Sequence, residues 1–273
     1  MQYFRIALAV ICVTAVQHAA SAADMPVKAA SPAPARAIYN WYGFYIGGHL
    51  GYGWGGDAIT FQPGTIYAPA FAAGFLPSSL ADDPKGILGG IQYGSNWQFN
   101  RLVLGLESDF SFSDIKATQT IVSTIPNGVL TSSGDQKLSW FSTTRGRVGY
   151  TITDNLLLYG TGGLAAGRAN ATSSFLLAGC PVGNCIAGTR AKTLWGWTAG
   201  GGLEYGIGHW SVRIEYLHYD LGDLNYTMTD ASLPLPGAFI NTSTKFSGEI
   251  VRAGFNYRFD WTPMDLLLGR RGI

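Results

Sequence analysis

Eight segments of this sequence alternate apolar residues with small or polar ones at a period of two, and their apolar positions are rich in aromatic and β-branched side chains. This period predicts β-strands, because successive side chains of a strand point to opposite faces. The predicted strands cover residues 43–55, 86–99, 102–113, 138–152, 156–169, 193–207, 210–221 and 246–259. Beyond the N-terminus no apolar run reaches the length of about 18 residues that a membrane-spanning helix needs.

The connections between these segments alternate in length. Three are tight turns, at residues 100–101, 153–155 and 208–209. The others are long and polar or contain proline, and they cover residues 56–85, 114–137, 170–192 and 222–245. Outer-membrane barrels have short periplasmic turns and longer extracellular loops, and an even strand number places both barrel ends in the periplasm.

The polarity of the two faces of the predicted strands does not fit a water-soluble sandwich. The aromatic and aliphatic phase is the larger one, and only 13% of the chain is charged, against about 25% in a soluble domain. A membrane barrel turns its apolar phase to lipid and its polar phase inward. We therefore expect an all-β, transmembrane, eight-stranded antiparallel up-and-down β-barrel. Rings near the strand ends, including Trp41 and Tyr45, are expected to form the interfacial girdles.

Charged residues of the opposite phase are expected to fill the barrel interior. The bore of an eight-stranded barrel is just wide enough for side chains, and buried charges have to be paired. Four acids and five arginines form this predicted interior charge network, and glycines of the same phase leave room for them. The network consists of Glu107, Asp109, Arg145, Arg147, Glu204, Arg213, Glu215, Arg252 and Arg258.

The N-terminus reads as an export signal. Arg5 precedes an apolar run over residues 6–16, and Ala20-Ser21-Ala22 resembles a cleavage site. We therefore divide the chain into a signal peptide (1–22), an Ala/Pro-rich periplasmic leader (23–40), an outer-membrane barrel (41–259) and a C-terminal tail (260–273). Without Arg5 the mature chain has 17 basic and 17 acidic residues and no basic block, which argues against nucleic acid as a partner.

Two cysteines remain in the mature chain, at Cys180 and Cys185. An exported chain meets an oxidising compartment, so a disulfide that staples the loop is the favoured interpretation. Metal binding is the alternative, but no histidine lies nearby.

Four stretches of the chain resemble a known family. They are residues 39–54, 104–110, 145–150 and 251–259, and they look like strands of the small porin-like outer-membrane proteins and surface antigens of alphaproteobacteria, which belong with the OmpA-type barrels. The resemblance implies an abundant, surface-exposed protein of the Gram-negative outer membrane with a role in envelope integrity. Some members of this family are described as porins or as haem-binding. The chain departs from the family pattern by continuing past Phe259.

The leading hypothesis is a structural barrel and surface antigen whose interior is plugged by salt bridges. A narrow passive porin, a protein that binds haem or a host surface through its loops, and a lipid-modifying enzyme are the alternatives. We expect no enzyme, because His49, His209 and His218 lie in no catalytic or metal-binding pattern. We expect no cofactor. The expected partners are outer-membrane lipids and lipopolysaccharide and the barrel-assembly machinery; a homo-oligomer and loop contacts with host molecules stay open.

Overall fold

The computed structural model describes residues 39–56, 58–126, 128–178, 186–230 and 235–267. The predicted signal peptide and the Cys180–Cys185 disulfide lie outside the described residues. The elements are β1 (Gly43–Trp54), β2 (Ile59–Pro63), α1 (Ala68–Ala72), β3 (Ser79–Leu80), β4 (Lys85–Phe99), β5 (Leu102–Ile125), β6 (Gly128–Thr153), β7 (Leu156–Leu177), β8 (Ile186–Ile207), β9 (Trp210–Thr229), β10 (Phe239–Arg258) and α2 (Pro263–Leu267).

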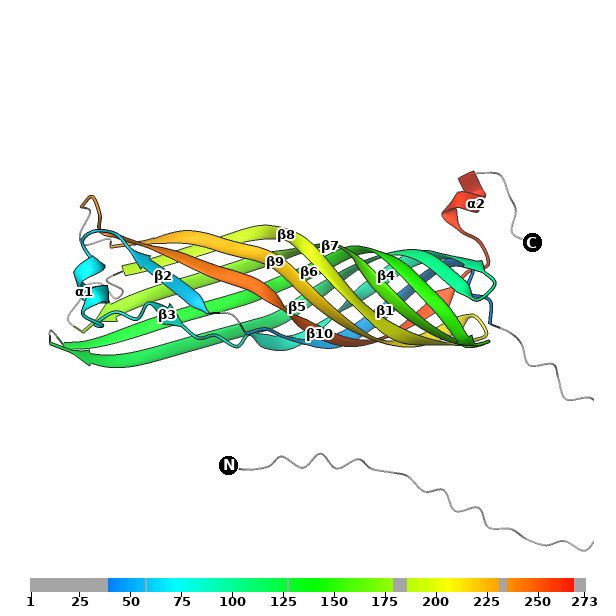
Figure 1. Ribbon diagram of the computed structural model, residues 1–273, viewed down its shortest axis with the longest axis horizontal. Coiled ribbons are helices and arrows are strands. Elements are labelled where there is room, and N and C mark those ends of the chain that lie inside the picture. The colour runs from blue at the N-terminus through cyan, green and yellow to red at the C-terminus, as the bar shows by residue number, and fades with distance from the viewer. Residues whose placement is uncertain (1–38, 57, 127, 179–185, 231–234, 268–273) are drawn as a thin grey trace, which may run out of the picture. The chain divides into compact units, whose positions relative to one another are not determined.

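Eight of the strands form a closed antiparallel ring (Figure 1). The order is β1-β4-β5-β6-β7-β8-β9-β10, and β10 pairs back onto β1, for example at Gly51 and Arg252. Closure leaves the half near the tight turns without an unpaired edge, while farther along the β8–β9 register is interrupted between Ala187 and Trp197. The tight turns lie at one end, where Asn100 and Gly208 take φ angles of 54° and 62°, a region that both residue types tolerate. The eight-stranded barrel predicted from the sequence is confirmed.

The long connections, in contrast, are shorter than predicted because the strands continue into them. β5 and β6 stay paired as far as Ile125 and Gly128, and β7 and β8 as far as Phe175 and Ile186. Much of 114–137, 170–192 and 222–245 is therefore barrel wall. The first long connection, 56–85, folds into a hairpin of β2 and β3 with α1 between them. β2 extends the wall beyond β1, on the side away from the tight turns, by pairing with β10 (Figure 1).

The strands change character along their length. Near the tight turns the outward residues are aliphatic and aromatic and the inward ones are charged; toward the other end this relation reverses. On β6, for instance, Arg145 points inward near the tight turns, while farther along Leu138 is buried and Lys137 is exposed. A β-bulge between Leu138 and Phe141 moves the inward positions from even to odd numbers. The barrel thus has a lipid-facing half and an extension built like a water-soluble protein.

Two aromatic residues assigned to the girdle lie inside the barrel, which corrects that part of the prediction. Trp41 is 1% and Tyr45 is 3% exposed. Tyr45 shares the inward parity of His49, and Trp41 packs with Tyr39, Val103 and Leu157 to close the tight-turn end. Among the described residues no helix has the length and apolar character that a membrane span requires.

The segment after the last strand packs against the first one. The backbone N–H of Phe44 donates to the carbonyl oxygen of Trp261 at 2.6 Å, and the two rings stack with centroids 5.6 Å apart. The Tyr42 hydroxyl donates to Asp265 at 2.5 Å. The start of the tail is therefore docked on the barrel rim at the tight-turn end.

Candidate functional site: the filled interior of the barrel

The charged layer of the interior begins with the strand register. Antiparallel pairing sets Glu107 opposite Arg145, Glu204 opposite Arg213, and Glu215 opposite Arg252. Residues directly opposite on one face of a sheet have Cβ atoms about 5 Å apart, so the backbone alone places acids beside arginines. Arg145 uses this proximity and contacts Glu107 at 2.5 Å, as Arg252 contacts Glu215 at 2.6 Å.

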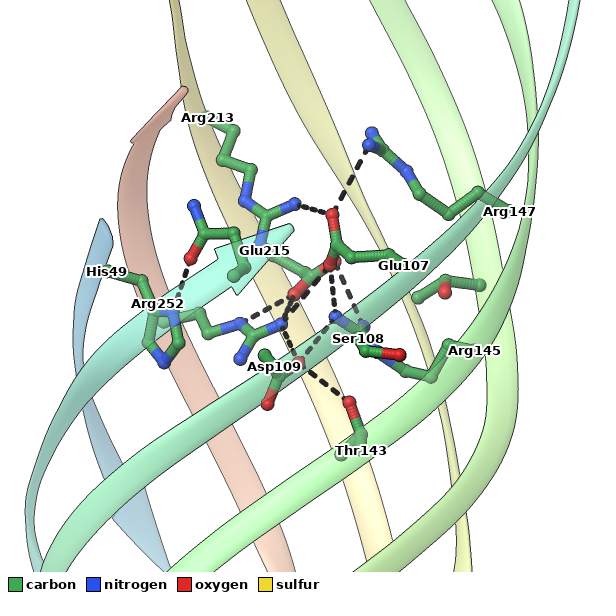
Figure 2. A network of polar contacts seen from close by, with 12 residues as sticks. His49, Glu107, Ser108, Asp109, Thr143, Arg145, Arg147, Arg213, Glu215 and Arg252 are labelled. Carbon is green, nitrogen blue, oxygen red and sulfur yellow. Dashed lines mark hydrogen bonds and ion pairs between the residues drawn. The ribbon is translucent and has the colours of Figure 1, made fainter. Parts of the chain in front are cut away.

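Other ion pairs cross the bore and join strands that are not neighbours (Figure 2). Arg213 on β9 contacts Glu107 on β5, leaving Glu204, its register partner, to Arg147 at 2.6 Å. Arg145 reaches Glu215 at 3.1 Å, and Arg252 reaches Asp109 at 3.0 Å. These bridges tie β5, β6, β8, β9 and β10 together through the middle of the barrel.

Tyrosines and polar side chains complete the layer from the remaining strands. The Tyr45 hydroxyl of β1 donates to Glu107 at 2.7 Å, and the Tyr159 hydroxyl of β7 donates to Glu215 at 3.0 Å. The Arg147 guanidinium also lies over the Tyr159 ring, 4.0 Å from its centroid. His49 bonds Gln92 of β4 and, at 2.7 Å, Ser111. The sequence prediction lacked Tyr45 and Tyr159, although both share the inward parity of their strands.

The layer is electrically balanced and almost inaccessible to bulk solvent. Eight of the nine predicted residues are brought together, four carboxylates with four guanidiniums, and their side chains are 0–4% exposed. Such a cluster does not by itself stabilise a fold more than apolar packing would, but loss of one member leaves an unpaired buried charge. The arrangement holds the charges in place across the bore.

Arg258, the ninth predicted residue, stands apart from this network. It pairs with Asp260 at 2.6 Å, donates to the carbonyl oxygen of Tyr42, and lies over the Tyr39 ring at the tight-turn end. Its partner comes from the tail, so strand parity alone did not reveal it. In the described part of the chain no cluster of three or more His, Cys, Asp or Glu side chains is arranged to hold a metal ion.

Beyond the charged layer, away from the tight turns, the interior is largely apolar. Its core joins inward residues of the long strands with the β2–β3 connection, from which Ile59, Phe61, Leu76 and Leu80 are buried. Phe61 and Phe71 contact the Phe175 ring on β7 edge to face. Most large apolar residues of the first long connection thus pack against the barrel interior, while Ile66 and Phe75 are 38% and 39% exposed.

One carboxylate at this mouth gives a pH-dependent prediction. Asp82 follows β3 and is 4% exposed; burial, together with neighbouring Asp83 and Asp135, raises its pKa to about 6. The proton is bound more tightly in the folded state, so this group favours folding below pH 4 and loses that contribution as the pH rises through 6. Asp82→Asn is expected to raise the urea midpoint at pH 8 and leave it unchanged at pH 4. Equal shifts at both values would contradict the assignment.

Fold and interior together define a closed transmembrane β-barrel with a filled bore. The family described as "Outer membrane protein beta-barrel domain" matches residues 6–259, and the chain belongs to this family. It is therefore an outer-membrane protein of Gram-negative bacteria, as the sequence resemblance implied.

Two relatives agree with this assignment. The chain is 36% identical to the 31 kDa outer-membrane immunogenic protein of Brucella melitensis over 244 residues, 88% of this chain and 93% of the relative. It is 28% identical to the 22 kDa outer membrane protein of Rhizobium leguminosarum over 74% of this chain and 75% of the relative. Among solved structures, Ail of Yersinia pestis aligns with 79% of this chain and 99% of its own at 12% identity and a TM-score of 0.31. The names of the two bacterial relatives refer to no catalysed reaction.

Proposed function

We propose that this protein is a structural barrel and surface antigen that contributes to the integrity of the outer membrane and does not conduct solutes. The observation that carries the proposal is the buried charge layer: eight charged side chains from five strands fill the bore at one level and form ion pairs with one another there. A structure of this kind is rigid, because each side chain is held by partners on other strands.

Two more layers support the non-conducting part of this proposal. The apolar core with Ile59 and Leu80 fills the extension above the charges, and Trp41 with Tyr39 closes the tight-turn end below them. Water-filled lumens occur in barrels of about 16–18 strands, not in those of eight. The narrow porin is therefore the weaker alternative.

The proposal predicts that the purified barrel, inserted in a planar bilayer, gives no steady conductance. The expected trace is a flat baseline with rare transients, and liposomes that carry the protein should not swell in isotonic sugar. A larger, water-filled porin reconstituted in parallel is the control. Steady channels of nanosiemens size would overturn the non-conducting barrel.

The envelope role predicts a phenotype in the source bacterium. Deleting the gene should increase leakage of periplasmic enzymes and sensitivity to detergent, and the wild-type gene should restore both. A normal envelope in the deletion strain would contradict the structural role.

The antigen role has a separate measurement. The relatives named immunogenic support it, as does the barrel extension, which carries an exposed polar surface beyond the lipid-facing half. Antibodies raised against the folded barrel are expected to bind intact cells and not cells of the deletion strain. Binding that requires prior disruption of the membrane would exclude surface exposure.

A further inference from the structure

The structure holds a row of three lysines on the outer surface of the barrel, where the lipid-facing half meets the extension. Register pairs Lys85 of β4 with Lys116 of β5, and Lys116 with Lys137 of β6. All three side chains are exposed. Like charges directly opposite one another destabilise a sheet, so this row is unfavourable unless negative charge compensates it.

The chain itself compensates the row only in part. Asp114 contacts Lys116 at 2.8 Å and Lys137 at 3.1 Å, and its own side chain is 47% exposed. Lys85 pairs with no carboxylate in the part of the chain that the structure describes. A shallow depression of about 230 Å³ lies beside the row, between Lys116 and Lys137 and the polar side chains of Thr118, Asn170 and Thr172, with Asp135 at its wall.

The position of the row matches the depth of lipid headgroups. On its other side, Lys85 is the register partner of Trp54 on β1. Two outward positions from Lys116 toward the tight turns, Phe112 and Trp140 face each other across β5 and β6. Phe112 is 73% exposed, and Trp140 stacks with Phe110 at 5.8 Å. Aromatic rings of this kind mark the membrane interface, so the ammonium groups lie just beyond the hydrocarbon.

The outward charges near the lysine row are also unevenly distributed around the barrel. Outward cations on β4–β8 outnumber the outward carboxylates, Asp114 and Asp135. On β9, β10 and β1 the order is reversed, because Lys245 is the one outward lysine or arginine against Asp220, Asp223 and Glu249. The outward cations of the β4–β8 side are Lys85, Lys116, Lys137 and Arg168. One side of the rim is therefore suited to an anionic surface.

We propose that the row Lys85–Lys116–Lys137 binds the phosphate groups of an anionic glycolipid headgroup in the outer leaflet, while the lipid's acyl chains lie along Phe112 and Trp140. The ring belt below the row favours a lipid over a free anion, and the row's place at the interface favours a headgroup over a soluble polymer. The inference rests on the orientation of the barrel in the outer membrane and not on the envelope role, so either can fail alone.

Native mass spectrometry of the folded barrel tests the site, with diphosphorylated lipid A and its dephosphorylated form as probes. A lysine at an anionic surface contributes about 1 kcal/mol, so Lys137→Gln should weaken diphosphorylated lipid A binding about five-fold, and the triple Lys→Gln variant about a hundred-fold. Dephosphorylated lipid should bind the wild type and the triple variant equally. Lys245→Gln removes a rim lysine that pairs with Asp220 on the other side, and should bind as the wild type does.

Heat-shifted mobility on gels checks that each variant is folded; if the triple variant is not, Lys137→Gln and Lys85→Gln are compared with Lys245→Gln. Equal loss in Lys137→Gln and Lys245→Gln would overturn the site. So would unchanged binding in the triple variant. If inorganic phosphate binds as tightly as the lipid and displaces it, the row is a simple anion site and the proposed lipid site is wrong.

Discussion

Glu107→Gln is expected to lower the free energy of unfolding of the barrel by about 3–5 kcal/mol. Glu107 contacts Arg145 at 2.5 Å, Arg213, and Arg147 at 3.4 Å, and all four side chains are at most 2% exposed. The amide keeps the shape of the side chain but not its charge, so it leaves one arginine uncompensated where bulk solvent does not reach. Urea unfolding in lipid vesicles, followed by tryptophan fluorescence, measures the change.

Glu249→Gln is the matched control on the outside of the same barrel. Glu249 contacts His218 at 2.8 Å and also Tyr216, but its side chain is 28% exposed. An ion pair in contact with solvent contributes at most about 1 kcal/mol. If the two substitutions shift the urea midpoint equally, the interior layer is not the solvent-inaccessible, coupled network described above.

A second substitution separates charge balance from lost packing. In the described part of the chain Glu107 is the one carboxylate within ion-pair distance of Arg213. Glu107→Gln with Arg213→Met therefore removes a matched pair and restores neutrality. We expect the double variant to be more stable than the sum of the single changes predicts, with a coupling energy of about 0.5–3 kcal/mol. Additive losses would show that the two side chains do not interact.

The alternation along the strands correctly placed the charged residues on the inner face of the barrel, but it could not assign their ion-pair partners. Register alone pairs Glu204 with Arg213, yet Arg213 contacts Glu107 and Glu204 contacts Arg147. A guanidinium on a long side chain reaches across a narrow bore as easily as along it, so the choice depends on three-dimensional packing. Tyr45 was misplaced for a different reason: an aromatic ring near a strand end suits a girdle and an interior equally, and its parity with His49 was the deciding signal.

The barrel extension escaped prediction because its environment changes along each strand. Outward aromatic residues marked the strands as far as Ser113, and beyond it the outer surface meets water, so the apolar phase moves inside. The bulge near Trp140 also changes the inward parity of β6, and inward positions on β9 change after Gly222. A search for one constant alternation therefore ends at the membrane surface, although the hydrogen-bonded strands continue.

The boundary between the two halves predicts opposite outcomes for one kind of substitution on one strand. Leu106 and Val122 both point outward from β5 and are 57% and 65% exposed. Leu106→Arg places a charge in hydrocarbon and is expected to lower the free energy of unfolding by about 2–4 kcal/mol. Val122→Arg places it in water and should change that free energy by less than about 0.5 kcal/mol.

Urea unfolding in vesicles gives both values, and the comparison locates the membrane independently of the interior. Both residues lie on the outer face of the same strand, so the strand and the face do not account for a difference in the free energy of unfolding between the two variants. Similar losses at the two positions would mean that lipid covers the extension as well. A small loss at Leu106 would mean that the aliphatic belt does not lie in the hydrocarbon. The expected difference follows because nothing in the bilayer replaces the water that the guanidinium gives up at Leu106, while at Val122 it keeps its hydration.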